Sequence, residues 1–161
     1  MVGAATLAVA AGCAGGDAET ASKDFPGADK PLTKAQFIPR ADAICRDVKR
    51  AQERYSERIR ALDRVDDLTR LAPILDGAEG ASRKGLERLR ALPRPREDRA
   101  TLDAYYAAAG RLAAASAQLA EAARSNDRAK GREVAATSGS LSAEQKRLAD
   151  EYGFEECGDA F

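Results

Sequence analysis

Two cysteines near the ends of the patterned part of the chain constrain its fold most strongly. Cys45 closes the run Phe37-Ile-Pro-Arg-Ala-Asp-Ala-Ile-Cys45, and Cys157 lies in Tyr152-Gly-Phe-Glu-Glu-Cys-Gly158. A bond between them closes a loop of more than a hundred residues, which adds up to about 4–5 kcal/mol in the chain-entropy model. That is a large share of the ~5–15 kcal/mol typical of a whole domain. We expect a Cys45–Cys157 disulfide, with two free buried thiols as the alternative.

The residues between these cysteines favour helices. Aromatic residues make up only 5% of the chain and alanine dominates the apolar set, whereas sheets draw on aromatic and β-branched side chains. Apolar residues recur at steps of three and four, which is typical of helices that bury one face. The four stretches are 37–62, 68–92, 102–123 and 134–152. Their alanine-rich seams favour a narrow, tight bundle over a roomy internal pocket.

Capping residues mark where the first two helices begin. Thr33 and Gln36 have the spacing of a capping box at the start of the first helix. Pro39 then predicts an irregular first turn or a regular helix that begins only at Pro39. After a turn over residues 63–67, Asp66 or Asp67 is placed to cap the second helix.

Breaking residues mark the other boundaries. Pro73 predicts a kink or break early in the second helix, and Leu92-Pro-Arg-Pro-Arg96 ends it. Ser125-Asn126-Asp127 separates the third helix from the fourth. Gly153 is placed to stop the fourth helix, so that Phe154 folds back as an apolar clasp. In an up-down-up-down four-helix bundle the first and last ends meet, which brings the cysteines within reach of each other.

Residues 1–12 form a short apolar run that ends in small residues before Cys13. The run is too short for a membrane-spanning helix and is typical of a signal segment. Ala10-Ala11-Gly12-Cys13 resembles the lipobox of bacterial lipoproteins, in which the signal is cut before a lipid-bearing cysteine. Ala10 stands where Leu is more usual, and no Lys or Arg precedes the run. An ordinary signal peptide or a disordered alanine-rich start is the alternative.

Residues 13–32 are rich in Gly, Ala, Asp and Ser and are predicted to form a disordered, lipid-anchored tether. As a flexible coil this segment spans roughly 25 Å. Residues 33–161 then form the single helical bundle domain. Localisation on the outer face of the cell membrane, anchored by the N-terminal lipid, follows from this organisation.

The two cysteine-bearing ends together resemble a known group of proteins. An F-x-x-x-A-D-x-I-C start, here residues 37–45, and a Y-G-F-x-x-C-G end, here residues 152–158, resemble small exported and often lipid-anchored helical proteins of actinobacteria. The resemblance covers roughly residues 33–158. It implies a location and an architecture, and no activity carries over from it.

Composition also limits the chemistry. The chain has no His, which excludes His-based triads, His-ligated haem and the His-containing zinc and di-iron sites of helical bundles. With no recognisable nucleophile arrangement, we expect a protein that is not an enzyme, with no catalytic residue, metal site or cofactor. Lys plus Arg and Asp plus Glu number 26 each. This balance gives no bulk attraction to polyanions, so we expect no nucleic-acid partner.

Four arginines at a spacing of four residues form a stripe along the first helix. They are Arg46, Arg50, Arg54 and Arg58. The stripe is either a solvated face, partly neutralised by nearby acids, or a contact surface for anionic lipid head groups beside the tether.

Two smaller groups of residues carry side chains that could contribute to a site. Tyr105 is expected in the core and Tyr106 at its edge, where it would pack or line a groove. Glu155, Glu156 and Asp159 would suit a hard cation, but neighbouring acids near a chain end are usually solvated and no EF-hand spacing is present.

These observations favour a non-catalytic extracytoplasmic lipoprotein that acts as a binding or interaction module at the cell envelope. Its partners would be the membrane, through the lipid anchor, and an unknown envelope protein. An exposed apolar patch would mark such a module. The alternative is a small-ligand carrier, which needs an apolar cavity of roughly a few hundred Å3 between helices. The alanine seams disfavour it, and an enzyme is the least supported class.

Overall fold

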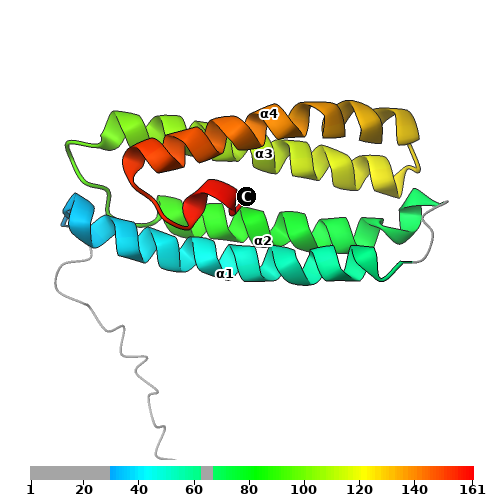
Figure 1. The fold of residues 1–161 in the computed structure, drawn as a ribbon, viewed down its shortest axis with the longest axis horizontal. Helices are drawn as coiled ribbons and strands as arrows, with labels where there is room; N and C mark the ends of the chain where they lie inside the picture. The colour runs from blue at the N-terminus through cyan, green and yellow to red at the C-terminus, as the bar shows by residue number, and fades with distance from the viewer. Residues whose placement is uncertain (1–29, 63–66) are drawn as a thin grey trace, which may run out of the picture.

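The computed structural model describes residues 30–62 and 67–161 and contains four long helices that run alternately up and down (Figure 1). The helices are α1 (Lys34–Arg60), α2 (Ala72–Arg90), α3 (Arg99–Arg124) and α4 (Arg128–Tyr152), with short 3-10 helices η1 (Leu68–Arg70) and η2 (Cys157–Asp159). The predicted all-α four-helix bundle closed by a Cys45–Cys157 disulfide is confirmed. The signal segment 1–12, Cys13 and positions 14–29 of the predicted tether lie outside the described residues, as do positions 63–66.

The start of α1 shows the predicted capping box. The Thr33 hydroxyl accepts a hydrogen bond from the Gln36 N–H at 3.3 Å, and the Gln36 side chain accepts one from the Thr33 N–H at 3.1 Å. The helix therefore begins at Lys34, and the predicted start at Pro39 is wrong. Because the cap satisfies the first donors, Pro39 removes only one backbone hydrogen bond from a helix that is already established.

The entry to α2 is broken near Pro73, as predicted. The Asp67 carboxylate accepts a hydrogen bond from the Thr69 N–H at 2.9 Å, so Asp67 caps η1 rather than α2 itself. Helix α2 begins only at Ala72 and carries Pro73 in its first turn, where backbone N–H groups have no intrahelical partner anyway. It then runs without interruption to Arg90, just before the proline pair.

Helix α4 has the predicted caps at both ends. At its start, the Asp127 carboxylate accepts a hydrogen bond from the Lys130 N–H at 2.9 Å. At its end, Gly153 adopts a left-handed φ of 95°, a conformation that residues other than glycine tolerate poorly. The chain then turns back, and Phe154 is buried in the core as the expected apolar clasp.

The core is richest at the end of the bundle where α1 begins and α4 ends, which we call the proximal end. Aromatic rings gather there, with Phe154 at 4.7 Å from Tyr152, 5.1 Å from Tyr105 and 6.2 Å from Phe37 between ring centroids. Such tilted aromatic pairs contribute beyond their buried area. The opposite end, where α1 ends and α4 begins, is the distal end.

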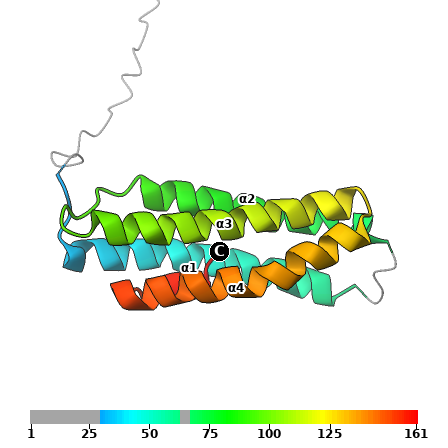
Figure 2. The same cartoon turned by 90° about the horizontal axis from the view of Figure 1, so that it is seen from above.

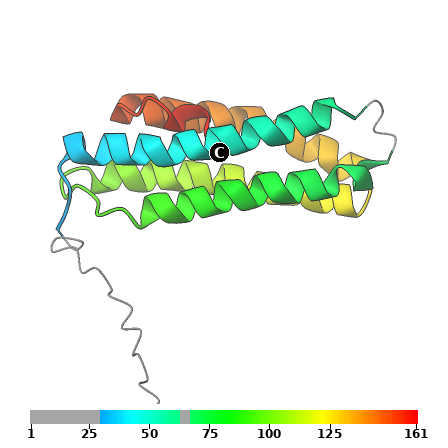
Figure 3. The same ribbon diagram turned by 90° about the horizontal axis from the view of Figure 1, so that it is seen from below.

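The C-terminal tail fills a place between two helices. Helices pack in sequence, α1 on α2, α2 on α3 and α3 on α4. Side chains of α1 and α4 meet at the proximal end, where the Phe37 ring lies edge-on to the Tyr152 ring at 6.2 Å. Further along, η2 lies against both α4 and α1 (Figures 2 and 3). The tail thus acts as a short fifth element that closes the proximal part of the bundle.

Candidate functional site

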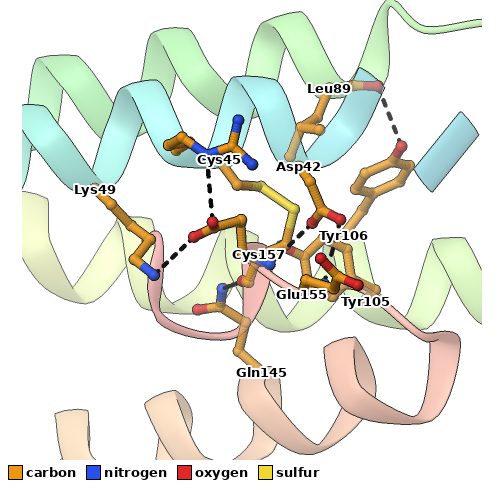
Figure 4. The surroundings of a disulfide bond; sticks show 11 residues. Asp42, Cys45, Lys49, Leu89, Tyr105, Tyr106, Gln145, Glu155 and Cys157 are labelled. Carbon is orange, nitrogen blue, oxygen red and sulfur yellow. Dashed lines mark hydrogen bonds and ion pairs between the residues drawn. A yellow bond between two sulfur atoms is a disulfide. The ribbon is translucent and has the colours of Figure 1, made fainter. Parts of the chain in front are cut away.

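The disulfide joins the middle of α1 to the tail (Figure 4). Cys45 and Cys157 are separated by 112 positions in the sequence, their Cα atoms are 5.0 Å apart, and both are fully buried. Only a thiolate acts as a nucleophile or soft metal ligand, and neither sulfur is available in that form. The disulfide is therefore a structural part of the site.

Asp42, one turn before Cys45, binds the backbone of the tail. Its carboxylate accepts hydrogen bonds from the N–H groups of Glu155 at 3.2 Å and Glu156 at 3.0 Å. Asp42 is only 5% exposed. Hydrogen bonds to an ionised carboxylate are among the stronger ones in proteins, so this residue fixes the path of the chain into the disulfide.

Two neutral donors converge on the carbonyl oxygen of Cys157. The Tyr105 hydroxyl donates to it at 3.1 Å and the Gln145 side-chain amide at 2.8 Å. Burial raises the pKa of Tyr105 far above its ordinary value, so the hydroxyl stays protonated and can donate. The Gln145 Oε1 atom is buried without a hydrogen-bond partner in the described part of the chain.

Tyr106 is also buried, and from the edge of the core it lines an open hollow together with Arg90, Arg94 and Asp103, in agreement with its predicted place. Its hydroxyl donates to the Leu89 carbonyl at 3.2 Å, and only 5% of the residue is exposed. Burial raises its pKa to about 12, although Arg94 and Arg90 oppose that shift. Both neighbouring tyrosines are thus used in packing, because α2 and the tail cover adjacent faces of α3.

The acidic residues of the tail are engaged by basic side chains of the bundle. Glu156 pairs with Lys49 at 2.9 Å and with Arg46 at 3.3 Å, and the hydrogen bonds to these two residues lower its pKa. Asp159 lies 3.8 Å from Lys146. Within residues 30–62 and 67–161, no three His, Cys, Asp or Glu side chains gather where a metal ion could be held.

The arginine stripe lies on the exposed face of α1, with its members in different environments. Arg46 pairs with Glu156, Arg50 pairs with Asp47, and Arg58 lies over the Tyr55 ring at 5.8 Å. Much of the stripe's charge is therefore compensated locally. Contact with anionic head groups stays a prediction.

An open apolar hollow lies at the distal end. It measures about 430 Å3 and is bordered by bulky side chains from α1, η1, α2 and α3. These side chains are Ile59, Leu68, Leu71, Leu75 and Leu119. We call this feature the distal hollow.

The distal hollow stays open because α4 presents small residues to it. Gly131 and Ala135 line it from that side, and a Cβ atom built on Gly131 would meet nothing within 4 Å. The alanine seams predicted a narrow bundle without a roomy internal pocket, and this hollow is instead open at the surface. The hollow forms where the leucine-rich entry to α2 faces the glycine-containing start of α4. The spacing of residues within each helix does not reveal that these two segments face each other.

Two arginines of α4 also line the distal hollow, Arg128 and Arg132. Arg128 lies close enough to Asp67 to help lower its pKa, although hydrogen bonds from Thr69 contribute most to that shift. Arg132 is exposed and has no ion pair or hydrogen bond within the part of the chain that the structure describes. The hollow therefore combines an apolar lining with a basic border.

None of the helices in the described ranges combines the length and the hydropathy that crossing a bilayer requires. Comparison of the chain with protein-family models, curated proteins and solved structures finds no match.

Proposed function

We propose that this chain is a non-catalytic extracytoplasmic binding module, held at the outer face of the cell membrane by a lipid on Cys13, that meets its partner through the distal hollow. The observation that carries the proposal is the hollow itself. Exposed apolar surface bordered by polar residues is typical of interaction sites. In this chain it lies at the end of the bundle opposite the start of α1, which is the end that the predicted tether would join.

The disulfide supports the proposed compartment. Structural disulfides persist in oxidising environments and are rare where thiols are kept reduced. Here the disulfide is combined with a buried carboxylate, Asp42, and with two donors to the Cys157 carbonyl. A fully buried disulfide at a tail held in this way suits a protein that works outside the cytoplasm.

The polar groups near the disulfide support binding rather than catalysis. Asp42, Tyr105 and Gln145 each hold the tail in place. If these side chains took part in a reaction, they would have to give up the hydrogen bonds that hold the tail. The distal hollow has the opposite character, since its side chains are apolar and its border is exposed.

A small-ligand carrier is the second candidate, and the size of the distal hollow favours it. Pockets for small molecules commonly measure roughly 300–1,000 Å3 and are mostly apolar with a few polar groups that set orientation. The hollow, at about 430 Å3 with two arginines at its border, fits that description.

Site-specific photocrosslinking in the native envelope tests whether the hollow is the binding surface. A crosslinking amino acid is placed at Leu75, which lines the hollow, or at Lys84, which is exposed on the same helix. We expect a discrete adduct from position 75 and a clearly weaker one from position 84. Equal labelling from both positions, or none from position 75, would contradict the proposal.

The anchor has its own test. We expect Cys13→Ser to move the protein from the membrane fraction to the soluble extracytoplasmic fraction. Retention of the variant in the membrane fraction would remove lipidation of Cys13 from the proposal. The disulfide serves as the control, because it should form equally in both proteins.

A further inference from the structure

We propose that the distal hollow binds an amphiphile with one acyl chain and an anionic head group, with the chain in the hollow and the head at Arg132. This inference rests on the proposed function, since it takes the hollow to be the binding surface and names the chemistry of its ligand.

The lining defines the apolar part of the ligand. Ile59, Leu71 and Leu119 present aliphatic carbon to the hollow from three different helices or their ends. Leu68 and Leu75 extend this lining along η1 and α2. No aromatic residue is among the described residues that line it, so this lining offers dispersion contacts to an aliphatic chain rather than stacking to a flat ring system.

The border defines the polar part. Arg132 lies at the hollow and makes no ion pair in the described ranges, which leaves its guanidinium available to a carboxylate or phosphate oxygen. Three acids of the described residues on α2 and around the start of α4 have other partners. Asp76 pairs with Arg124, Asp127 caps α4 through the Lys130 N–H, and Glu133 pairs with Lys130. A cationic head group would meet Arg132 and Arg128 and would be repelled.

The size of the hollow favours one acyl chain over two. Its volume of about 430 Å3 lies near the lower end of the roughly 300–1,000 Å3 range of small-molecule pockets. The hollow is also open to solvent along its border, so a charged head group can stay hydrated while it contacts arginine. Burial of the chain and solvation of the head are therefore compatible in one bound arrangement.

Two glycines of α4 provide a matched pair of test variants. Gly131 lines the hollow, whereas Gly139 lies two turns further along and does not, and a Cβ atom on either meets nothing within 4 Å. Replacing either by leucine improves helix propensity, so both variants are expected to fold. Only Gly131→Leu fills part of the hollow.

Isothermal titration of the full exported protein with dodecanoate, below its micellar concentration, tests the inference. We expect Gly131→Leu to weaken binding at least about tenfold, which corresponds to about 1.4 kcal/mol, while Gly139→Leu binds like the unmodified protein. Arg132→Gln is expected to weaken dodecanoate binding about threefold to fivefold, the range of an exposed ion pair, while Arg99→Gln leaves it unchanged. Dodecanol should bind equally to all the arginine variants.

Two measurements can overturn the inference, namely binding of a ligand with a different head group and the location of the NMR amide shifts. Dodecyltrimethylammonium that binds as tightly as dodecanoate would refute the anionic head group. If dodecanoate shifts amide resonances only of residues that do not line the hollow, and leaves those of Gly131 and Ala135 unchanged, the location is refuted independently of how any variant folds. If dodecanoate does not bind but position 75 still crosslinks to an envelope protein, the ligand class is wrong and the proposed function stands. If both fail, both are wrong.

Discussion

Reduction of the Cys45–Cys157 disulfide should remove a large part of the stability of the bundle. The bond spans 112 positions, and both cysteines are fully buried. In the chain-entropy model a loop of this length restricts the unfolded chain by about 4–5 kcal/mol. Measured losses for native disulfides run at roughly 2–5 kcal/mol.

The native contacts of the tail determine where within that range the loss falls. Phe154 remains packed among aromatic rings, and Asp42 still accepts two backbone hydrogen bonds, when only the bond between the sulfurs is removed. The folded state should therefore keep its geometry, and the effect should act through the greater freedom of the unfolded chain. We expect a loss of about 3–5 kcal/mol.

Urea unfolding with and without reductant, followed by far-UV circular dichroism, measures this loss. With a urea dependence of roughly 1–3 kcal/mol per molar, the midpoint should fall by about 2 M in the reduced protein. The double variant Cys45→Ala with Cys157→Ala is the control, because reductant should not change its midpoint. A reduced protein within about 1 kcal/mol of the oxidised one would refute the view that the disulfide stabilises the bundle through the unfolded chain.

Two further predictions concern the tail. Gly153→Ala should lower the free energy of unfolding by about 1–2 kcal/mol, because alanine is strained at a φ of 95°. The added Cβ makes only an ordinary contact, so the loss reports the backbone conformation. Gly139→Ala, in regular helix, is the control and should raise the free energy of unfolding by about 0.5–1 kcal/mol in the same denaturation assay. The pKa of Glu156 is lowered in the folded protein by Lys49 and Arg46, so its contribution to stability is complete above the unfolded pKa of roughly 4.3 and is lost as the pH falls through the folded value. The difference in stability between the unmodified protein and Glu156→Gln should therefore shrink on acidification from pH 6 to pH 3, and a constant difference would contradict the assignment.

Local signals in the sequence predict the ends of the helices and the disulfide well. The capping box at Thr33, the cap at Asp127 and the left-handed Gly153 each depend on a few neighbouring residues, so the pattern contains the information needed. The two cysteines were predictable because an antiparallel bundle with four helices brings its first and last ends together. The alternative of a helix that begins only at Pro39 was wrong, because the cap at Thr33, six residues earlier, outweighs a single missing hydrogen bond.

The distal hollow and the polar contacts of the tail were not predictable in the same way. The hollow depends on which residue of one helix faces which residue of another, as Leu75 faces the side of α4 that carries Gly131. The hydrogen bond from Tyr106 to the Leu89 carbonyl could not be predicted, because periodicity describes one face of a helix, whereas α3 packs against neighbours on more than one side. Which residues face each other depends on how the helices pack, and the pattern of a single helix does not contain that information.

The two ends of the bundle should also differ in local stability, and α1 shows why. Its buried residues run from Phe37 to Val48, and none of its later residues up to Arg60 is buried. Amides with few buried apolar neighbours exchange through local opening at a lower free energy than global unfolding. We therefore expect amides in the last two turns of α1 to exchange at least about tenfold faster than those around Cys45, a difference of about 1.4 kcal/mol.

Hydrogen exchange followed by mass spectrometry or NMR measures this difference and links it to the distal hollow. Ile59 belongs to the weakly buried part of α1 and also lines the hollow, so a ligand there should slow exchange in the last turns of α1. Since the protein would then order its distal end on binding, part of the binding free energy would be used for that ordering. The proximal amides around Cys45 are the internal control, because their exchange should not respond to the ligand. Uniform protection along α1 without ligand would refute the division between a stable proximal end and an adaptable distal end.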